Sequence, residues 1–203
     1  MLLLFSFCFT MKTFANTCDF ISNRYYNIID NKEDINIDKI KSKAKSAKTY
    51  CLKKRYNTEY CFLLDYSLPS GENRFFIYNM KTNKIELSGL VAHGSCNTRF
   101  LKEAKFSNQI GCGCSSYGKY QIGGKYSGRF GIAYKLYGLE GSNNNAYTRN
   151  IVLHSYAEVP DKETYPLPIC NSLGCVMVSN NFIKKLAKII DKTKYPILLW
   201  VYE

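Results

Sequence analysis

Short apolar and aromatic runs, separated by turns rich in glycine and asparagine, make up most of the chain after residue 60. These runs are too short for core helices and are rich in β-branched and aromatic residues, which predicts strands. Strand following strand, with few helical repeats, is typical of a mainly β domain of the α+β class, either a β-sandwich or an open barrel. The predicted strands span residues 60–66, 74–79, 85–93, 149–154 and 195–202.

Two segments have a helical period instead. The first predicts a helix over residues 179–191, with Ser179 or Asn180 as its N-cap. Its apolar face consists of Phe182, Leu186, Ile189 and Ile190. The second predicts an amphipathic helix with a lysine-rich face, which either packs beside the β domain or binds a wall or membrane surface. Its apolar stripe consists of Ile37, Ile40, Ala44, Ala47 and Cys51.

The first eleven residues form an apolar run that is too short to span a bilayer but long enough for the core of a signal peptide. Small residues then stand where signal peptidase cleaves, so we expect a signal peptide at residues 1–15 and export to the periplasm or cell envelope. The alternative is a buried terminal strand. A basic helical segment follows at residues 16–59, and the main domain spans 60–203. No other segment approaches the length of a membrane span.

The chain has 203 residues, of which 46% are hydrophobic, so one packed domain with a modest appendage is expected. Lysine and arginine total 28 against 16 acidic residues, which gives a formal charge of +12. Because nucleic-acid-binding motifs are absent, we expect no nucleic-acid partner. The charge suits attraction to an anionic envelope, although solubility alone would also explain it.

One histidine and one cysteine stand where chemistry would be expected. His154 ends a strand-like run, and Cys175 follows Gly174 at the start of another. A free thiol with a pKa near ~8.5 is mostly protonated at neutral pH, and a neighbouring imidazolium can lower that pKa. Gly174 would permit a sharp turn whose backbone N–H groups face an incoming carbonyl. The structural alternative is a buried apolar Cys and a hydrogen-bonded His at a strand end.

The spacing from His154 to Ser172-x-Gly174-Cys175 resembles the signature of the L,D-transpeptidases, the YkuD-type cysteine enzymes that cross-link peptidoglycan. Further blocks occur in the order of a divergent branch, the murein L,D-transpeptidase catalytic domain family, and cover residues 60–203. These blocks are residues 74–80, 90–94, 106–108, 116–120, 126–131, 136–140 and 143–146, with Arg149.

The sequence departs from the mainstream family at two positions. Leu173 and Met177 stand where that family has a second His and an Arg or Asn, and the divergent branch resembles this chain in lacking both. The group that binds the oxyanion or a substrate carboxylate therefore stays open. The candidates for substrate binding are His93, Arg129, Arg149 and Ser172. His93 has an equal alternative as a structural hydrogen-bonding residue at a strand end.

The resemblance implies an acyl transfer with peptidoglycan stem peptides as partners and without a metal or organic cofactor. Cys175 would attack a stem-peptide carbonyl, His154 would act as general base and acid, and the Gly174 backbone would help to hold the oxyanion. An amine acceptor gives a cross-link, and water gives an L,D-carboxypeptidase. A non-catalytic, cationic envelope-binding protein on the same scaffold is the third possibility. The sequence does not indicate an oligomeric state.

Nine cysteines raise the question of disulfides. Setting aside Cys8 in the predicted signal peptide and Cys175 leaves seven, an odd number, so they cannot all pair within one chain. We expect Cys96 to pair with either Cys112 or Cys114. No cysteine has a companion at metal-ligand spacing, so no metal site is expected. A bridge between Cys170 and Cys175 would switch the nucleophile off.

Overall fold

A computed structural model describes residues 37–203, and the predicted signal peptide at residues 1–15 lies outside them. The chain divides into two compact units, Met1–Ser42 and Lys43–Glu203. Residues 37–54 are helical. Within the second unit Ala44, Ala47 and Cys51 of this helix are buried, as an amphipathic helix requires. In residues 37–203, no helix is long and apolar enough to cross a bilayer.

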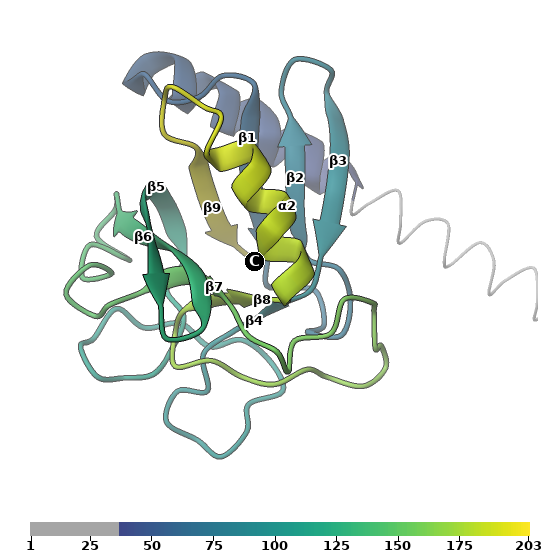
Figure 1. The fold of residues 1–203 in the computed structure, drawn as a ribbon, viewed down its shortest axis with the longest axis vertical. Coiled ribbons are helices and arrows are strands. Elements are labelled where there is room, and N and C mark those ends of the chain that lie inside the picture. The colour runs from purple at the N-terminus through teal and green to yellow at the C-terminus, as the bar shows by residue number, and fades with distance from the viewer. Residues whose placement is uncertain (1–36) are drawn as a thin grey trace, which may run out of the picture. The chain divides into compact units, whose positions relative to one another are not determined.

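Within residues 37–203, nine strands form one mixed sheet in the order β3-β2-β1-β9-β5-β6-β7-β8-β4 (Figure 1). Most neighbours are antiparallel, but β1 pairs with β9 and β7 pairs with β8 in parallel. The mainly β class predicted from the sequence is therefore confirmed. The strands are β1 (Tyr60–Asp65), β2 (Phe75–Asn79), β3 (Lys84–Gly89), β4 (Val91–Ala92), β5 (Gly118–Gly128), β6 (Gly131–Gly138), β7 (Val152–Ser155), β8 (Val176–Val178) and β9 (Leu198–Tyr202).

The single strand predicted at residues 85–93 is in fact two strands at opposite edges of the sheet. β3 ends at Gly89 beside β2, whereas β4 begins at Val91 beside β8. Consecutive Cα atoms are about 3.8 Å apart, so the two edges must approach within roughly 8 Å at this point. The sheet therefore curls on itself, which is the open-barrel form of the predicted architecture.

The helix predicted after residue 178 is α2 (Asn180–Ile190), and Ser179 is its N-cap. The Ser179 hydroxyl accepts a hydrogen bond from the Phe182 backbone N–H at 3.0 Å. Phe182 packs edge-on against Phe75 of β2, with ring centroids 5.3 Å apart, and a Cβ on Gly89 would meet the Phe182 ring at 2.9 Å. The apolar face of the helix thus packs against the sheet and joins the main core.

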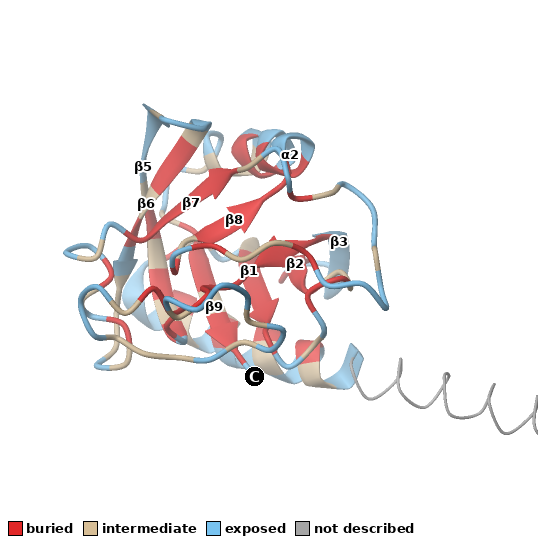
Figure 2. Cartoon of the chain, turned by 90° about the horizontal axis from the view of Figure 1, so that it is seen from below, coloured by how far each residue is buried: buried red, intermediate tan, exposed pale blue. Residues whose placement is uncertain are grey.

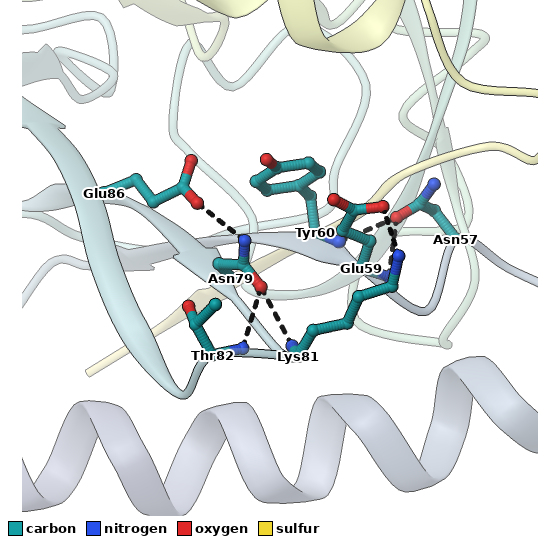
Figure 3. Close-up of polar contacts among 7 residues, drawn as sticks. All are labelled: Asn57, Glu59, Tyr60, Asn79, Lys81, Thr82 and Glu86. Atoms are coloured by element: carbon teal, nitrogen blue, oxygen red, sulfur yellow. Dashed lines mark hydrogen bonds and ion pairs between the residues drawn. The ribbon is translucent and has the colours of Figure 1, made fainter.

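The turn between β2 and β3 is held by the side chain of Asn79 (Figure 3). Its Oδ1 accepts hydrogen bonds from the backbone N–H groups of Lys81 at 2.9 Å and Thr82 at 3.1 Å, while its Nδ2 donates to Glu86. The Lys81 ammonium pairs with Glu59 at 2.7 Å. An asparagine that satisfies turn N–H groups in this way explains why the chain reverses here.

Candidate active site

Cys175 immediately precedes β8, at the end of a tight turn that the Ser172 hydroxyl closes. Ser172 Oγ accepts from the Gly174 N–H at 3.1 Å and donates to the Cys175 carbonyl at 2.8 Å. Gly174 has φ +107, and a Cβ there would lie 2.6 Å from the Cys114 carbonyl oxygen. Only glycine fits this position without strain. Because the Gly174 N–H already donates to Ser172, the oxyanion role suggested for it by the sequence is not supported by this geometry.

His154 lies on β7, next to β8. In the parallel pairing, His154 is opposite Met177, and Cys175 is two residues before Met177. Alternate residues of a strand share a face, so the side chains of His154 and Cys175 project from the same face. One strand spacing and two residue rises separate their Cα atoms by roughly 8 Å. Figure 2 shows both strands deeply buried.

His154 and Cys175 line the same cavity, which has a volume of about 650 Å³. Its other walls come from the loop that contains Phe100, the hairpin tip at Phe130 and the turn at Leu173. Phe100 and Leu173 are largely exposed, so the cavity has an apolar rim that is open to solvent. The structure therefore brings the two predicted chemical residues together in one accessible cavity.

The imidazole of His154 is fixed in one tautomer. Its Nδ1 lies 2.9 Å from the Ser155 carbonyl oxygen, which can only accept, so Nδ1 is protonated and Nε2 retains its lone pair. The ring stacks on Phe130, with centroids 5.4 Å apart and planes 21° apart. Burial lowers the pKa of His154, and the hydrogen bond to Ser155 opposes this only in part. The imidazole is therefore a neutral base at pH 7.

The Cys175 thiol donates a weak hydrogen bond to the Asn150 carbonyl oxygen, with a sulfur–oxygen distance of 3.7 Å. Burial raises the pKa of this thiol, while a backbone hydrogen bond from Val152 and the charge of Arg149 act in the opposite direction. The sequence suggested an imidazolium that lowers the thiol pKa. The structure instead favours a neutral thiol beside a neutral imidazole, so ionisation of the sulfur requires proton transfer to a base.

The tip of the β5–β6 hairpin covers His154. Gly128 pairs with Gly131, so Arg129 and Phe130 form a two-residue turn. The Phe130 carbonyl oxygen accepts from the Ser155 hydroxyl at 2.8 Å, and its ring packs edge-on against Tyr156 at 5.3 Å. The site residues Phe130, Ser155 and Tyr156 were not predicted. The two glycines that flank Arg129 and Phe130 were the available signal for this turn.

Residues 31–202 match the L,D-transpeptidase catalytic domain family, which covers most of the chain. The chain belongs to this family. Similar solved structures include the helical cell shape determining protein Pgp2 of Campylobacter jejuni, which is 14% identical with a TM-score of 0.43; the match covers 71% of this chain and 47% of that one. An L,D-transpeptidase from Mycobacterium smegmatis is 12% identical with a TM-score of 0.42, and 71% and 59% of the two chains are covered.

A third structure, an L,D-transpeptidase from Xylanimonas cellulosilytica, is 13% identical with a TM-score of 0.38, and 76% of this chain and 68% of that one are covered. The match spans about half the length of the first two structures, 47% and 59%. No curated protein matches the sequence.

In this L,D-transpeptidase domain His93 has no access to a substrate, which corrects its candidacy for substrate binding. It is fully buried. Arg74 donates to its Nδ1 at 2.8 Å, and its Nε2 lies 3.0 Å from the Leu101 carbonyl oxygen. Burial, with a smaller effect from Arg74, lowers the pKa of His93 to about 4. The His93 carbonyl oxygen accepts from the Ser172 N–H at 2.8 Å, so this residue supports the turn before Cys175.

Arg149 also has a structural position. Its guanidinium donates to the carbonyl oxygens of Ser107 at 2.9 Å and Cys114 at 2.5 Å, and to the Ser116 hydroxyl at 2.5 Å. These bonds join the segment before β7 to the loop that supports the Gly174 turn. These internal hydrogen bonds already occupy the Arg149 guanidinium, so direct substrate binding by Arg149 is not supported by this geometry.

Two further candidates differ in their exposure. Ser172 lines the cavity, but its hydroxyl is used within the turn, so it positions Cys175. Arg129 is exposed, with its guanidinium 5.5 Å from the centre of the Phe130 ring, and remains a candidate for substrate contact.

The cysteine pairing is resolved in favour of one predicted option. Cys96 forms a disulfide with Cys114, while Cys112 is free. Cys170 and Cys175 are both free and line the same cavity. Among residues 37–203, no group of His, Cys, Asp and Glu side chains is arranged to hold a metal ion.

Proposed function

We propose that this domain is a peptidoglycan L,D-transpeptidase in which Cys175 is the nucleophile and His154 is the general base and acid. The main support is that both residues line one open cavity. In addition, the His154 Nδ1–H donates to the Ser155 carbonyl oxygen, which leaves Nε2 as the basic nitrogen. A neutral imidazole of this kind can accept the thiol proton as the sulfur attacks.

The proposed reaction has two steps. Cys175 Sγ attacks the carbonyl of the third residue of a donor stem peptide, His154 Nε2 takes the thiol proton, and the same proton passes to the departing amine of the terminal D-Ala. A thioester remains on Cys175. The amine of a second stem then attacks the thioester, His154 removes a proton from that amine, and the proton returns to the sulfur as the cross-linked peptide leaves. No cofactor takes part in these steps.

The proposed location and partners follow from the family and the charge. The partners would be stem peptides of the cell wall, and the enzyme would act in the periplasm or cell envelope after export. A formal charge of +12 favours association with an anionic envelope. The predicted signal peptide at residues 1–15 belongs to this proposal.

Incubation of the purified protein with disaccharide tetrapeptides tests the reaction. Cross-linked dimers, absent with Cys175→Ala and strongly reduced with His154→Gln, are expected. If the products are monomers that have lost the terminal D-Ala, and no dimers form, the activity is that of an L,D-carboxypeptidase and not of a transpeptidase. If no product forms and a carbapenem adds no mass to the wild type, the protein is an envelope-binding relative without this activity, and the proposal fails.

A further inference from the structure

The face of the sheet that carries the site continues onto the β5–β6 hairpin. Ala133 of β6 is opposite His154 in one pairing and opposite Tyr126 in the other. Paired residues on neighbouring antiparallel strands project from the same face, so Tyr126 and His154 share a face of the sheet. The core residues Tyr134 and Leu136 lie on the other face. The hairpin therefore extends the surface on which the chemistry is proposed.

Lys135 is the charged residue at the centre of this extension. It is opposite Val152 of β7. The β7–β8 pairing places Leu153 opposite Val176, so Cys175 is next to Val152 in the same row across the sheet. Two strand spacings thus separate the Cα atoms of Lys135 and Cys175 by roughly 10 Å. Both side chains project from the same face.

Two tyrosine rings hold the Lys135 ammonium. Its Nζ lies 5.0 Å from the ring centroid of Tyr126 and 5.8 Å from that of Tyr147. Tyr147 is itself stacked on Tyr137, with centroids 5.4 Å apart and planes 12° apart. Cation–π contacts of this kind position an ammonium without neutralising its charge. The Lys135 stem is half-buried, and Tyr147 is 58% exposed, so a ligand can approach from solvent.

Two other lysines of the hairpin have carboxylate partners. Lys119 pairs with Glu140 at 2.5 Å, and Lys125 pairs with Asp191 at 2.6 Å. Among the ion pairs of residues 37–203, none includes Lys135. The Lys135 ammonium is half-buried, is oriented by two rings and projects from the same face of the sheet as the nucleophile. It is therefore suited to bind an anion from outside the chain.

We propose that Lys135, oriented by Tyr126 and Tyr147, binds a carboxylate of the donor peptide whose carbonyl Cys175 attacks. This inference rests on the proposed function, because it assigns a substrate group to the same site. A span of roughly 10 Å corresponds to about three residues of extended peptide. The bound carboxylate therefore belongs to a residue within about three positions of the attacked carbonyl, and Lys135 determines specificity for peptides that carry a negative charge there.

Calorimetric titration of the Cys175→Ala protein tests this without turnover. The probes are two synthetic stem tetrapeptides that differ only in having a free carboxylate or a carboxamide beside the residue whose carbonyl is attacked. We expect the carboxamide to bind about tenfold more weakly, as one charge-assisted hydrogen bond would give. Adding Lys135→Met should lower the affinity for the carboxylate peptide about tenfold and leave the affinity for the carboxamide peptide unchanged. Adding Lys135→Arg instead should restore most of the preference.

Lys125→Met is the matched control, because this lysine belongs to the same hairpin, is opposite the core residue Tyr134 and has an acidic partner. It should retain the full preference for the carboxylate. Thermal unfolding of each variant checks that it is folded. The inference is overturned if Lys135→Met lowers the affinity for both peptides equally, or lowers it for neither. It is also overturned if neither peptide binds to the Cys175→Ala protein. If the wild type cross-links the carboxylate and carboxamide peptides equally well, the carboxylate subsite is contradicted, whereas the proposed reaction is supported.

Discussion

Acidification should destabilise the fold by disrupting the buried hydrogen bond between Arg74 and His93. The guanidinium donates to His93 Nδ1, so protonation of the ring would place two cationic groups against each other. The pKa of His93 falls from an ordinary 6.5 to about 4. A lowered histidine pKa means that the unfolded chain binds the proton more readily, so the stabilisation is complete above pH 6.5 and is lost as the pH falls towards 4. At ~1.36 kcal/mol per pH unit, the loss is about 3 kcal/mol.

Urea unfolding between pH 7 and pH 4 measures this loss when the wild type is compared with His93→Gln. The chain has only two histidines, and His154 is present in both proteins, so the difference between their pH slopes isolates His93. We expect the free energy of unfolding of the wild type to fall by about 3 kcal/mol more than that of the variant. Equal slopes would refute the account of a neutral His93 that is held by Arg74 and that supports the turn before Cys175.

Three further results are expected at the site. Gly174→Ala should destabilise the fold by roughly 2–4 kcal/mol in thermal unfolding, because it combines φ +107 with a Cβ 2.6 Å from the Cys114 carbonyl oxygen; an unchanged melting temperature would contradict this. Ser172→Ala removes two hydrogen bonds, so we expect a loss of about 2 kcal/mol and slower acylation of Cys175, and unchanged acylation would argue against a positioning role. The acylation rate should be constant near pH 7 and fall only below the ordinary imidazole range, since the His154 pKa is lowered; a rate that keeps rising towards pH 9 would indicate attack by a free thiolate instead.

The sequence pattern predicted elements whose apolar residues are continuous or strictly periodic. The runs that became β1 and β2 and the helix after Ser179 were recognisable because one stretch of sequence contains the whole signal. The longest strand, β5, was not predicted, because Gly123 and Gly124 interrupt its alternation at a bulge between Ile122 and Lys125. A glycine-rich strand has few side chains to reveal its period. The break at Leu90 was also hidden, since it depends on which edge of the sheet each half joins.

At the site, the chemical types of the two main residues could be predicted from the sequence, but their surroundings could not. His154 and Cys175 were named from spacing and family resemblance, and the parallel pairing of β7 with β8 explains why residues 21 positions apart share a cavity. The contact between Nδ1 and the Ser155 carbonyl oxygen was invisible, because a backbone acceptor leaves no signature in the sequence. The structural interpretation of His93, one of two equal alternatives, could not be chosen from the sequence, because its hydrogen-bond partner Arg74 is 19 positions away.

The central claim is that the thiol at 175 is acylated with the imidazole at 154 as its base. Intact-mass spectrometry of the protein mixed with a donor tetrapeptide, sampled over time at pH 7, tests it most directly. The account predicts a thioester adduct on the wild type with release of D-Ala, no adduct on Cys175→Ala, and adduct formation slowed by at least about a hundredfold in His154→Gln. An adduct that forms at the wild-type rate without the imidazole, or on another residue when Cys175 is absent, would contradict it.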